Sequence, residues 1–78
     1  MNEALPENIF GERMCLARKH LGYTQTVLGD MVGTTKATIC NYEKGKISPP
    51  LNIAFAIAAA LEVPFTWLVG IDEYIKLY

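Results

Sequence analysis

The sequence predicts a compact all-α domain of five helices, and three observations support this. The chain has 78 residues, of which 51% are apolar and 19% charged, a balance typical of one small core and not of a disordered chain. Apolar residues recur at helical spacing in several segments. Glycines, prolines and capping residues separate those segments. Because no repeat or low-complexity run interrupts residues 1–78, we expect a single domain.

The first predicted helix covers about Ile9–Leu21. Residues 1–8 are expected to form an irregular lead, because Pro6 disfavours an earlier helix, and Asn8 is expected to cap the helix that follows. The apolar residues of one helical stripe are Phe10, Met14, Ala17 and Leu21. Gly22 is expected to end this helix.

Two short helices that meet at a tight turn, a helix-turn-helix unit, are predicted from Gln25 to Lys44. Thr24 is expected to cap the first helix and Thr35 the second. Gly33 supplies the left-handed backbone that the turn requires, and at Gly29 a side chain would collide with the second helix. The inward-facing residues are expected to be Leu28, Val32, Ile39 and Tyr42.

The fourth predicted helix, about Leu51–Leu61, is apolar on nearly every side. Its core-facing stripe is expected to be Leu51, Ala54, Phe55, Ala58 and Leu61. A helix of this kind is normally buried on more than one side, so a second subunit is expected to cover part of it. A fifth helix, Phe65–Val69, follows Pro64, and residues 71–78 form an apolar tail. The candidate dimer contacts are Ile53, Ala56, Ala60, Tyr74 and Leu77.

The outward residues of the second helix of the helix-turn-helix unit have the chemistry of DNA recognition. In DNA-binding units of this shape that helix enters the major groove and its first residues meet base edges. Lysine donates to guanine, asparagine pairs with adenine, and small apolar groups pack on thymine methyls. The candidate base-contacting residues are Lys36, Ala37, Thr38 and Asn41.

Phosphate contacts are expected around the same unit. Lysine side chains neutralise phosphates, and helix N-termini offer them free backbone N–H groups. The candidates are Lys19, Gln25, Thr35, Lys44 and Lys46. The net charge of the chain is −1, although residues 18–46 hold five basic and two acidic residues, so that positive charge gathers near the unit.

Composition argues against several other classes of protein. Two cysteines and one histidine are too few for a zinc site or a disulfide framework, so Cys15 and Cys40 are expected to be reduced thiols, and redox control through Cys40 is the minority alternative. No nucleophile stands with a matching base, so we expect no enzyme activity, no cofactor, no metal and no small-molecule ligand. The longest apolar run, Ile53–Leu61, is too short to span a membrane, and the acidic N-terminus disfavours secretion. The expected location is the cytoplasm.

The residues resemble those of the lambdoid-phage repressor and Cro family of helix-turn-helix regulators, also called the xenobiotic-response-element family. The resemblance covers about residues 9–69. It rests on Arg18, on Gln25 with Leu28-Gly29, on the stretches 33–39 and 42–46, and on LEVPFTWLVG at 61–70. It implies the five-helix fold, operator DNA as partner and binding as a dimer to a two-fold site.

The same resemblance implies roles for three residues that hold the unit together. Gln25 is expected to touch a phosphate and to brace the recognition helix. Arg18 and Glu43 match a pair that forms a largely buried salt bridge between the first and third helices.

The function predicted from these patterns is sequence-specific DNA binding by a transcriptional regulator. We expect a repressor that binds a pseudo-palindromic operator as a homodimer, with the third helix in the major groove. The alternative is a protein–protein interaction module on the same fold, such as an antirepressor or a toxin-neutralising partner. The net negative charge and the apolar fourth helix and tail favour that alternative.

Overall fold

The computed structural model describes residues 8–72, and its five helices confirm the predicted all-α class. They are α1 (Ile9–His20), α2 (Gln25–Val32), α3 (Lys36–Glu43), α4 (Leu51–Leu61) and α5 (Phe65–Val69). The predicted bounds agree with these, except that α1 and α3 each end one residue earlier than expected, with Leu21 and Lys44 as their C-caps. Two candidate dimer contacts, Tyr74 and Leu77, lie outside the described residues.

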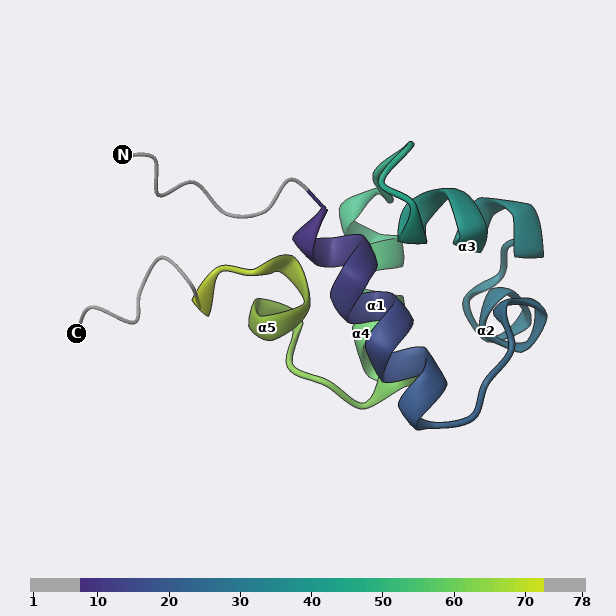
Figure 1. The fold of residues 1–78 in the computed structure, drawn as a ribbon, viewed down its shortest axis with the longest axis horizontal. Coiled ribbons are helices and arrows are strands. Elements are labelled where there is room, and N and C mark those ends of the chain that lie inside the picture. Colours follow the sequence, from purple (N-terminus) through teal and green to yellow (C-terminus); the bar gives the residue numbers. More distant parts are fainter. Residues whose placement is uncertain (1–7, 73–78) are drawn as a thin grey trace.

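The helices surround one core. Figure 1 shows α1 in front of α4 at the centre, α5 on one side of them and α2 and α3 on the other. Each of the five helices contributes at least one fully buried side chain to the centre, and these are Met14, Leu28, Ile39, Ile57, Leu61 and Leu68. Because every helix shares this core, the position of α3 is fixed by the packing of the whole domain.

The predicted turn chemistry of the helix-turn-helix unit is present. The hydroxyl of Thr24 accepts a hydrogen bond from the Val27 N–H at 3.0 Å, and Thr35 caps α3 in the same way through the Thr38 N–H at 3.2 Å. Gly33 ends α2 with φ +80°, a left-handed conformation that favours glycine. A Cβ at Gly29 would lie 3.0 Å from the carbonyl oxygen of Thr34, so the close approach is to the turn that precedes α3 rather than to α3 itself.

Asn8 stands at the N-cap of α1 but its side chain does not cap the helix, which corrects the prediction. Its amide nitrogen donates instead to the carbonyl oxygen of Glu43, at the end of α3, over 2.8 Å. Gly11 makes this contact feasible, because a Cβ there would lie within 2.6 Å of the carbonyl oxygens of Tyr42 and Glu43. The first turn of α1 therefore lies directly against the end of α3.

The core-facing side of α4 is also different from the prediction. Leu51 and Phe55 were expected in the core, but they are 64% and 50% exposed, whereas Ile57 is fully buried. The ring of Phe55 stacks on that of Phe65 at the surface, with the ring centroids 4.2 Å apart. The candidate dimer contacts on α4 are half-buried and pack against the protein's own core; they are Ile53, Ala56 and Ala60.

α5 is held against α1 by Arg13. Its guanidinium donates to the carbonyl oxygen of Trp67 and to the carboxylate of Asp72, at 2.6 and 2.9 Å, and lies 5.0 Å from the centre of the indole ring. Across residues 8–72, none of the helices has the length and apolar character needed to cross a membrane.

Candidate nucleic-acid interface

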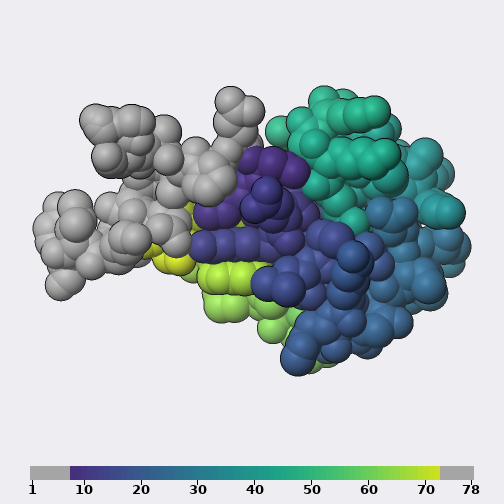
Figure 2. All heavy atoms as spheres, in the orientation of Figure 1, coloured from purple at the N-terminus to yellow at the C-terminus, as the bar shows by residue number. Residues whose placement is uncertain are grey.

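The outward side of α3 carries the residues predicted to meet base edges. Lys36 and Ala37 are exposed at the start of the helix, and Thr38 and Asn41 are half-buried beside them. Figure 2 shows α3, in teal, on the outer surface of the molecule next to α2, in blue. Ile39 and Tyr42 point inward, so the helix is amphipathic in the sense that the sequence predicts.

The end of α3 is fixed by a buried ion pair. The guanidinium of Arg18, on α1, meets both carboxylate oxygens of Glu43, with Nε–Oε2 at 2.6 Å and Nη2–Oε1 at 3.1 Å. Their side chains are only 10% and 6% exposed. A third N–H of Arg18 donates to the carbonyl oxygen of Tyr23, between α1 and α2, at 2.8 Å. A bidentate arginine–carboxylate pair of this kind is geometrically specific as well as strong.

Gln25 joins α2 to the same pair. Its Nε2 donates to Oε1 of Glu43 at 3.0 Å. That bond occupies one of the two hydrogens on Nε2, which leaves the second available to another acceptor. Glu43 thus receives donors from α1 and from α2, and the three helices are joined at one carboxylate.

The electrostatics of the pair favour its charged form. Burial alone would raise the pKa of Glu43, but hydrogen bonds from Arg18 and Gln25 and the charge of Arg18 outweigh burial and hold the pKa below its ordinary value. The hydrogen bond to Glu43 likewise raises the pKa of Arg18. Both groups are therefore ionised at neutral pH.

The candidate phosphate-contacting lysines are exposed. Lys44 and Lys46 flank Gly45, which has φ +75° and forms the turn after α3. Lys19 is exposed near the C-terminal end of α1. The capping residues Thr24 and Thr35 mark two helix N-termini, whose first backbone N–H groups suit an anion.

Sequence reasoning missed the hydrogen bond between Asn8 and the end of α3. A glycine inside the first turn of a helix, Gly11, was the signal that another backbone approaches there. The contact between Cys15 and Arg18 was also missed: Nη2 of Arg18 donates to Sγ of Cys15 over 3.8 Å.

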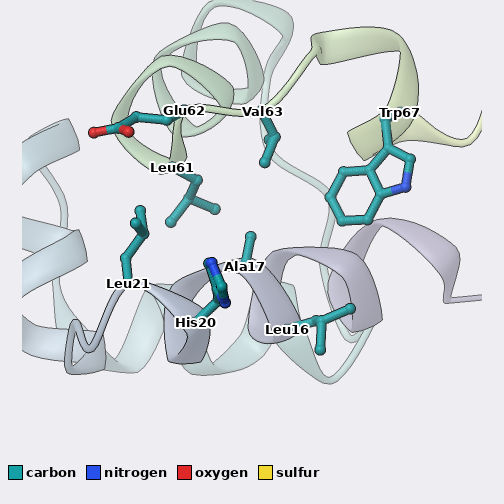
Figure 3. Close-up of a pocket in the computed structure, with 8 residues that line it drawn as sticks. All are labelled: Leu16, Ala17, His20, Leu21, Leu61, Glu62, Val63 and Trp67. Carbon is teal, nitrogen blue, oxygen red and sulfur yellow. The ribbon is translucent and has the colours of Figure 1, made fainter.

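A pocket of about 470 Å³ lies elsewhere on the molecule, between the end of α1 and the segment that joins α4 to α5. Figure 3 shows Leu61, Val63 and Trp67 directed toward α1, where Ala17 faces them. None of the predicted DNA-contacting residues lines this mainly apolar pocket. The polar residues with recognition chemistry therefore gather around α3, outside it.

Comparison with known proteins finds similar helix-turn-helix proteins. A helix-turn-helix family profile matches residues 16–68. An uncharacterized HTH-type transcriptional regulator of Methanothermobacter thermautotrophicus is 52% identical over 44 residues, which cover 56% of this chain and 64% of that protein. The uncharacterized HTH-type transcriptional regulator YgzD of Bacillus subtilis is 34% identical over 56 residues, which cover 72% of this chain and 85% of that protein.

Among solved structures, the P22 c2 repressor in complex with the synthetic operator 9T is similar to this chain, with a TM-score of 0.74 and 32% sequence identity. The match covers 77% of this chain and 91% of the repressor chain.

Proposed function

Since the chain belongs to the helix-turn-helix family of the lambdoid repressor and Cro type, we propose that it is a sequence-specific DNA-binding transcriptional regulator and that α3 enters the major groove. The observation that carries this proposal is the division of α3 into two sides. Lys36 and Ala37 are exposed on one side, while the other is packed into the core and held at Glu43. A rigid helix with an exposed lysine and alanine at its first turn suits base recognition.

The chemistry of the side chains on the outward face of α3 indicates which base edges each could contact. Lys36 can donate to O6 and N7 of guanine, and Asn41 can pair with N6 and N7 of adenine. The methyl groups of Ala37 and Thr38 suit the thymine methyl. We propose that these four residues contact bases.

Backbone contacts with DNA would surround that face. We propose that Lys19, Lys44 and Lys46 meet phosphates, together with the helix N-termini at Gln25 and Thr35. Such contacts position the protein without specifying sequence, and they make binding depend on salt. The excess of basic over acidic residues between positions 18 and 46 supports this assignment, even though the whole chain carries −1.

We further propose that residues 1–78 act as a single domain, as a repressor and as a homodimer on a pseudo-palindromic operator. The P22 c2 repressor, which resembles this chain, is itself bound to operator DNA in its crystal structure. Two-fold dimers of this class place their recognition helices about 34–36 Å apart, one helical turn of DNA. The exposed apolar side chains of Leu51 and Phe55 are the part of α4 best placed to meet a second copy, in preference to the half-buried Ile53, Ala56 and Ala60.

The experiment that tests this function is selection of bound sequences from a random DNA pool at about 50 and about 200 mM salt. We expect a two-fold symmetric motif that persists at the higher salt. A Lys36→Ala/Asn41→Ala variant serves as the control, because it keeps the phosphate contacts and should enrich no motif or a degenerate one. Weak binding without enrichment, lost as salt rises, would contradict the proposal.

One observation favours the alternative, a protein–protein interaction module. Leu51 and Phe55 leave an apolar surface on α4 that DNA would not cover if α3 enters the groove. Sedimentation of the purified protein separates the two functions. Self-association that is abolished in Phe55→Glu supports the dimeric regulator, whereas a stable monomer that enriches no DNA motif supports the interaction module.

A further inference from the structure

We propose that Asn8 is a positioning residue for DNA binding, because it holds the turn that carries Lys44 and Lys46 at the end of α3. The inference rests on the proposed function, since it concerns how those two lysines reach phosphates. Asn8 lies 35 residues before Glu43 in the chain, at the start of a different helix. Its amide is the only side-chain donor that the described residues offer to the carbonyl of Glu43.

The amide of Asn8 occupies a site between two glycines. A Cβ at Gly11, in α1, would lie 2.4 Å from its Oδ1, and a Cβ at Gly45, in the turn, would lie 2.7 Å from the same atom. Real Cβ atoms do not approach other atoms so closely, so each glycine leaves the space that the amide fills. The amide is therefore packed from both sides as well as hydrogen-bonded.

The hydrogen bond of Asn8 supplies a partner that the helix cannot. The last carbonyl groups of an α-helix have no partner within it, and Glu43 is the final residue of α3. Backbone hydrogen bonds at this end join the turn to α3 itself: the Gly45 N–H donates to the carbonyl of Tyr42 at 3.1 Å, and the Lys46 N–H to that of Asn41 at 2.9 Å. The bond from Asn8 links the Glu43 backbone to the start of α1, whereas Arg18 links only the Glu43 carboxylate to that helix.

The position of this backbone affects where the lysine side chains point more than it affects the stability of the fold. A lysine side chain is long and flexible, so an ammonium group reaches a phosphate often only when its backbone already points there. Lys44 and Lys46 lie on either side of Gly45, the residue against which the Asn8 amide packs. Removal of the Asn8 amide takes away the bond between this turn and the start of α1, whereas the turn keeps its bonds to α3 and the core of the domain stays in place.

The test compares Asn8→Ala and Asn8→Leu with the wild type by fluorescence anisotropy. All three proteins are titrated with the operator selected by the wild type and with random duplex DNA, at salt concentrations from about 50 to about 200 mM. Asn8→Leu keeps a similar side-chain size without polar atoms, so an effect shared by both variants comes from the hydrogen bond. We expect about three- to tenfold weaker binding to both DNAs, as for removal of one ordinary hydrogen bond. The salt slope should fall by up to about 0.9 for each phosphate that the variant no longer neutralises.

Two controls separate positioning from general destabilisation. Ile57→Val removes one methyl group from the core and so lowers the free energy of unfolding. It should leave the salt dependence of DNA binding unaltered. In a Lys44→Ala/Lys46→Ala background, Asn8→Ala should weaken DNA binding no further, because its effect passes through those lysines.

The possible results are distinct. Asn8 variants that bind like Ile57→Val would overturn the inference, and so would an Asn8→Ala effect that is undiminished in the double-lysine background, since Asn8 would then act independently of the turn. Both results leave the proposed function intact. A wild-type protein that binds no DNA in a salt-dependent way overturns the proposed function, and this inference with it.

Discussion

Replacing Arg18 by methionine should destabilise the domain more than any change on its surface. Methionine keeps much of the aliphatic stem of arginine and removes the guanidinium that meets both oxygens of Glu43. The carboxylate, 6% exposed, would retain the amide of Gln25 as a donor but no guanidinium. Removing one partner of a buried ion pair costs about 3–5 kcal/mol, because the other charge is left buried and unpaired.

That cost is large relative to the total stability of a domain of this size. At about 0.05–0.15 kcal/mol per residue, 78 residues give roughly 4–12 kcal/mol. Each kcal/mol moves the Tm of so small a domain by about 4–8 °C, so the Tm of Arg18→Met should fall by at least ~12 °C. Urea unfolding followed by circular dichroism at pH 7 measures the free energy directly.

A double-mutant cycle distinguishes a pair from two independent residues. Arg18→Met/Glu43→Met removes both charges and should be more stable than the sum of the two single changes implies. Arg13→Met is the matched control on the same helix, since its partner Asp72 is 42% exposed and the pair is worth less. The reasoning would be refuted by an Arg18→Met destabilisation below about 1 kcal/mol, or by single effects that simply add.

The remaining predictions concern acid, DNA and association. The folded-state pKa of Glu43 lies below its ordinary value of 4.5, so the ionised carboxylate stabilises the fold above that pH, and this stabilisation is lost as pH falls through the folded pKa. Glu43→Gln should therefore make the free energy of unfolding less dependent on pH in acid, and an unchanged pH dependence would contradict the role of Glu43. Lys36→Ala should remove about 1–3 kcal/mol of the binding free energy that discriminates at one base pair of the selected motif, as measured by competition with single-base variants of the operator. Equal weakening on random DNA would argue against a base contact. Lys46→Ala should weaken binding to all DNA alike and reduce the salt slope by about 0.9, so a constant slope would exclude a phosphate contact. Phe55→Glu should shift sedimentation from dimer to monomer with the helical circular dichroism spectrum retained, and a persistent dimer would place the interface elsewhere.

The parts of the fold that depend on local chemistry were predictable from the sequence. Thr24 and Thr35 cap helices through their own neighbours, and Gly33 adopts a left-handed conformation because the turn beside it demands one. These features depend on a few adjacent residues, so the local pattern is sufficient to place them.

Features that depend on a distant partner were not predictable in the same way. Asn8 has the residue type of a helix cap, and only the approach of Glu43 directs its amide elsewhere. In α4, where most positions are apolar, periodicity cannot decide which side faces the core, and so the pattern predicts Phe55 inside where the structure buries Ile57. The Arg18–Glu43 pair was expected from family resemblance alone, since charge and spacing do not pair residues 25 positions apart.

Three of the four residues proposed to contact bases take no part in holding α3 in place, and this has an evolutionary consequence; the fourth, Thr38, bonds to the capping residue Thr35. Within residues 8–72, Lys36, Ala37 and Asn41 make no side-chain hydrogen bond or ion pair, whereas Glu43 makes several. Function and stability commonly trade against each other when one side chain serves both. Here those three positions can be exchanged with little change in folding free energy, so under the proposed function new target sequences are accessible by single substitutions on an unchanged scaffold.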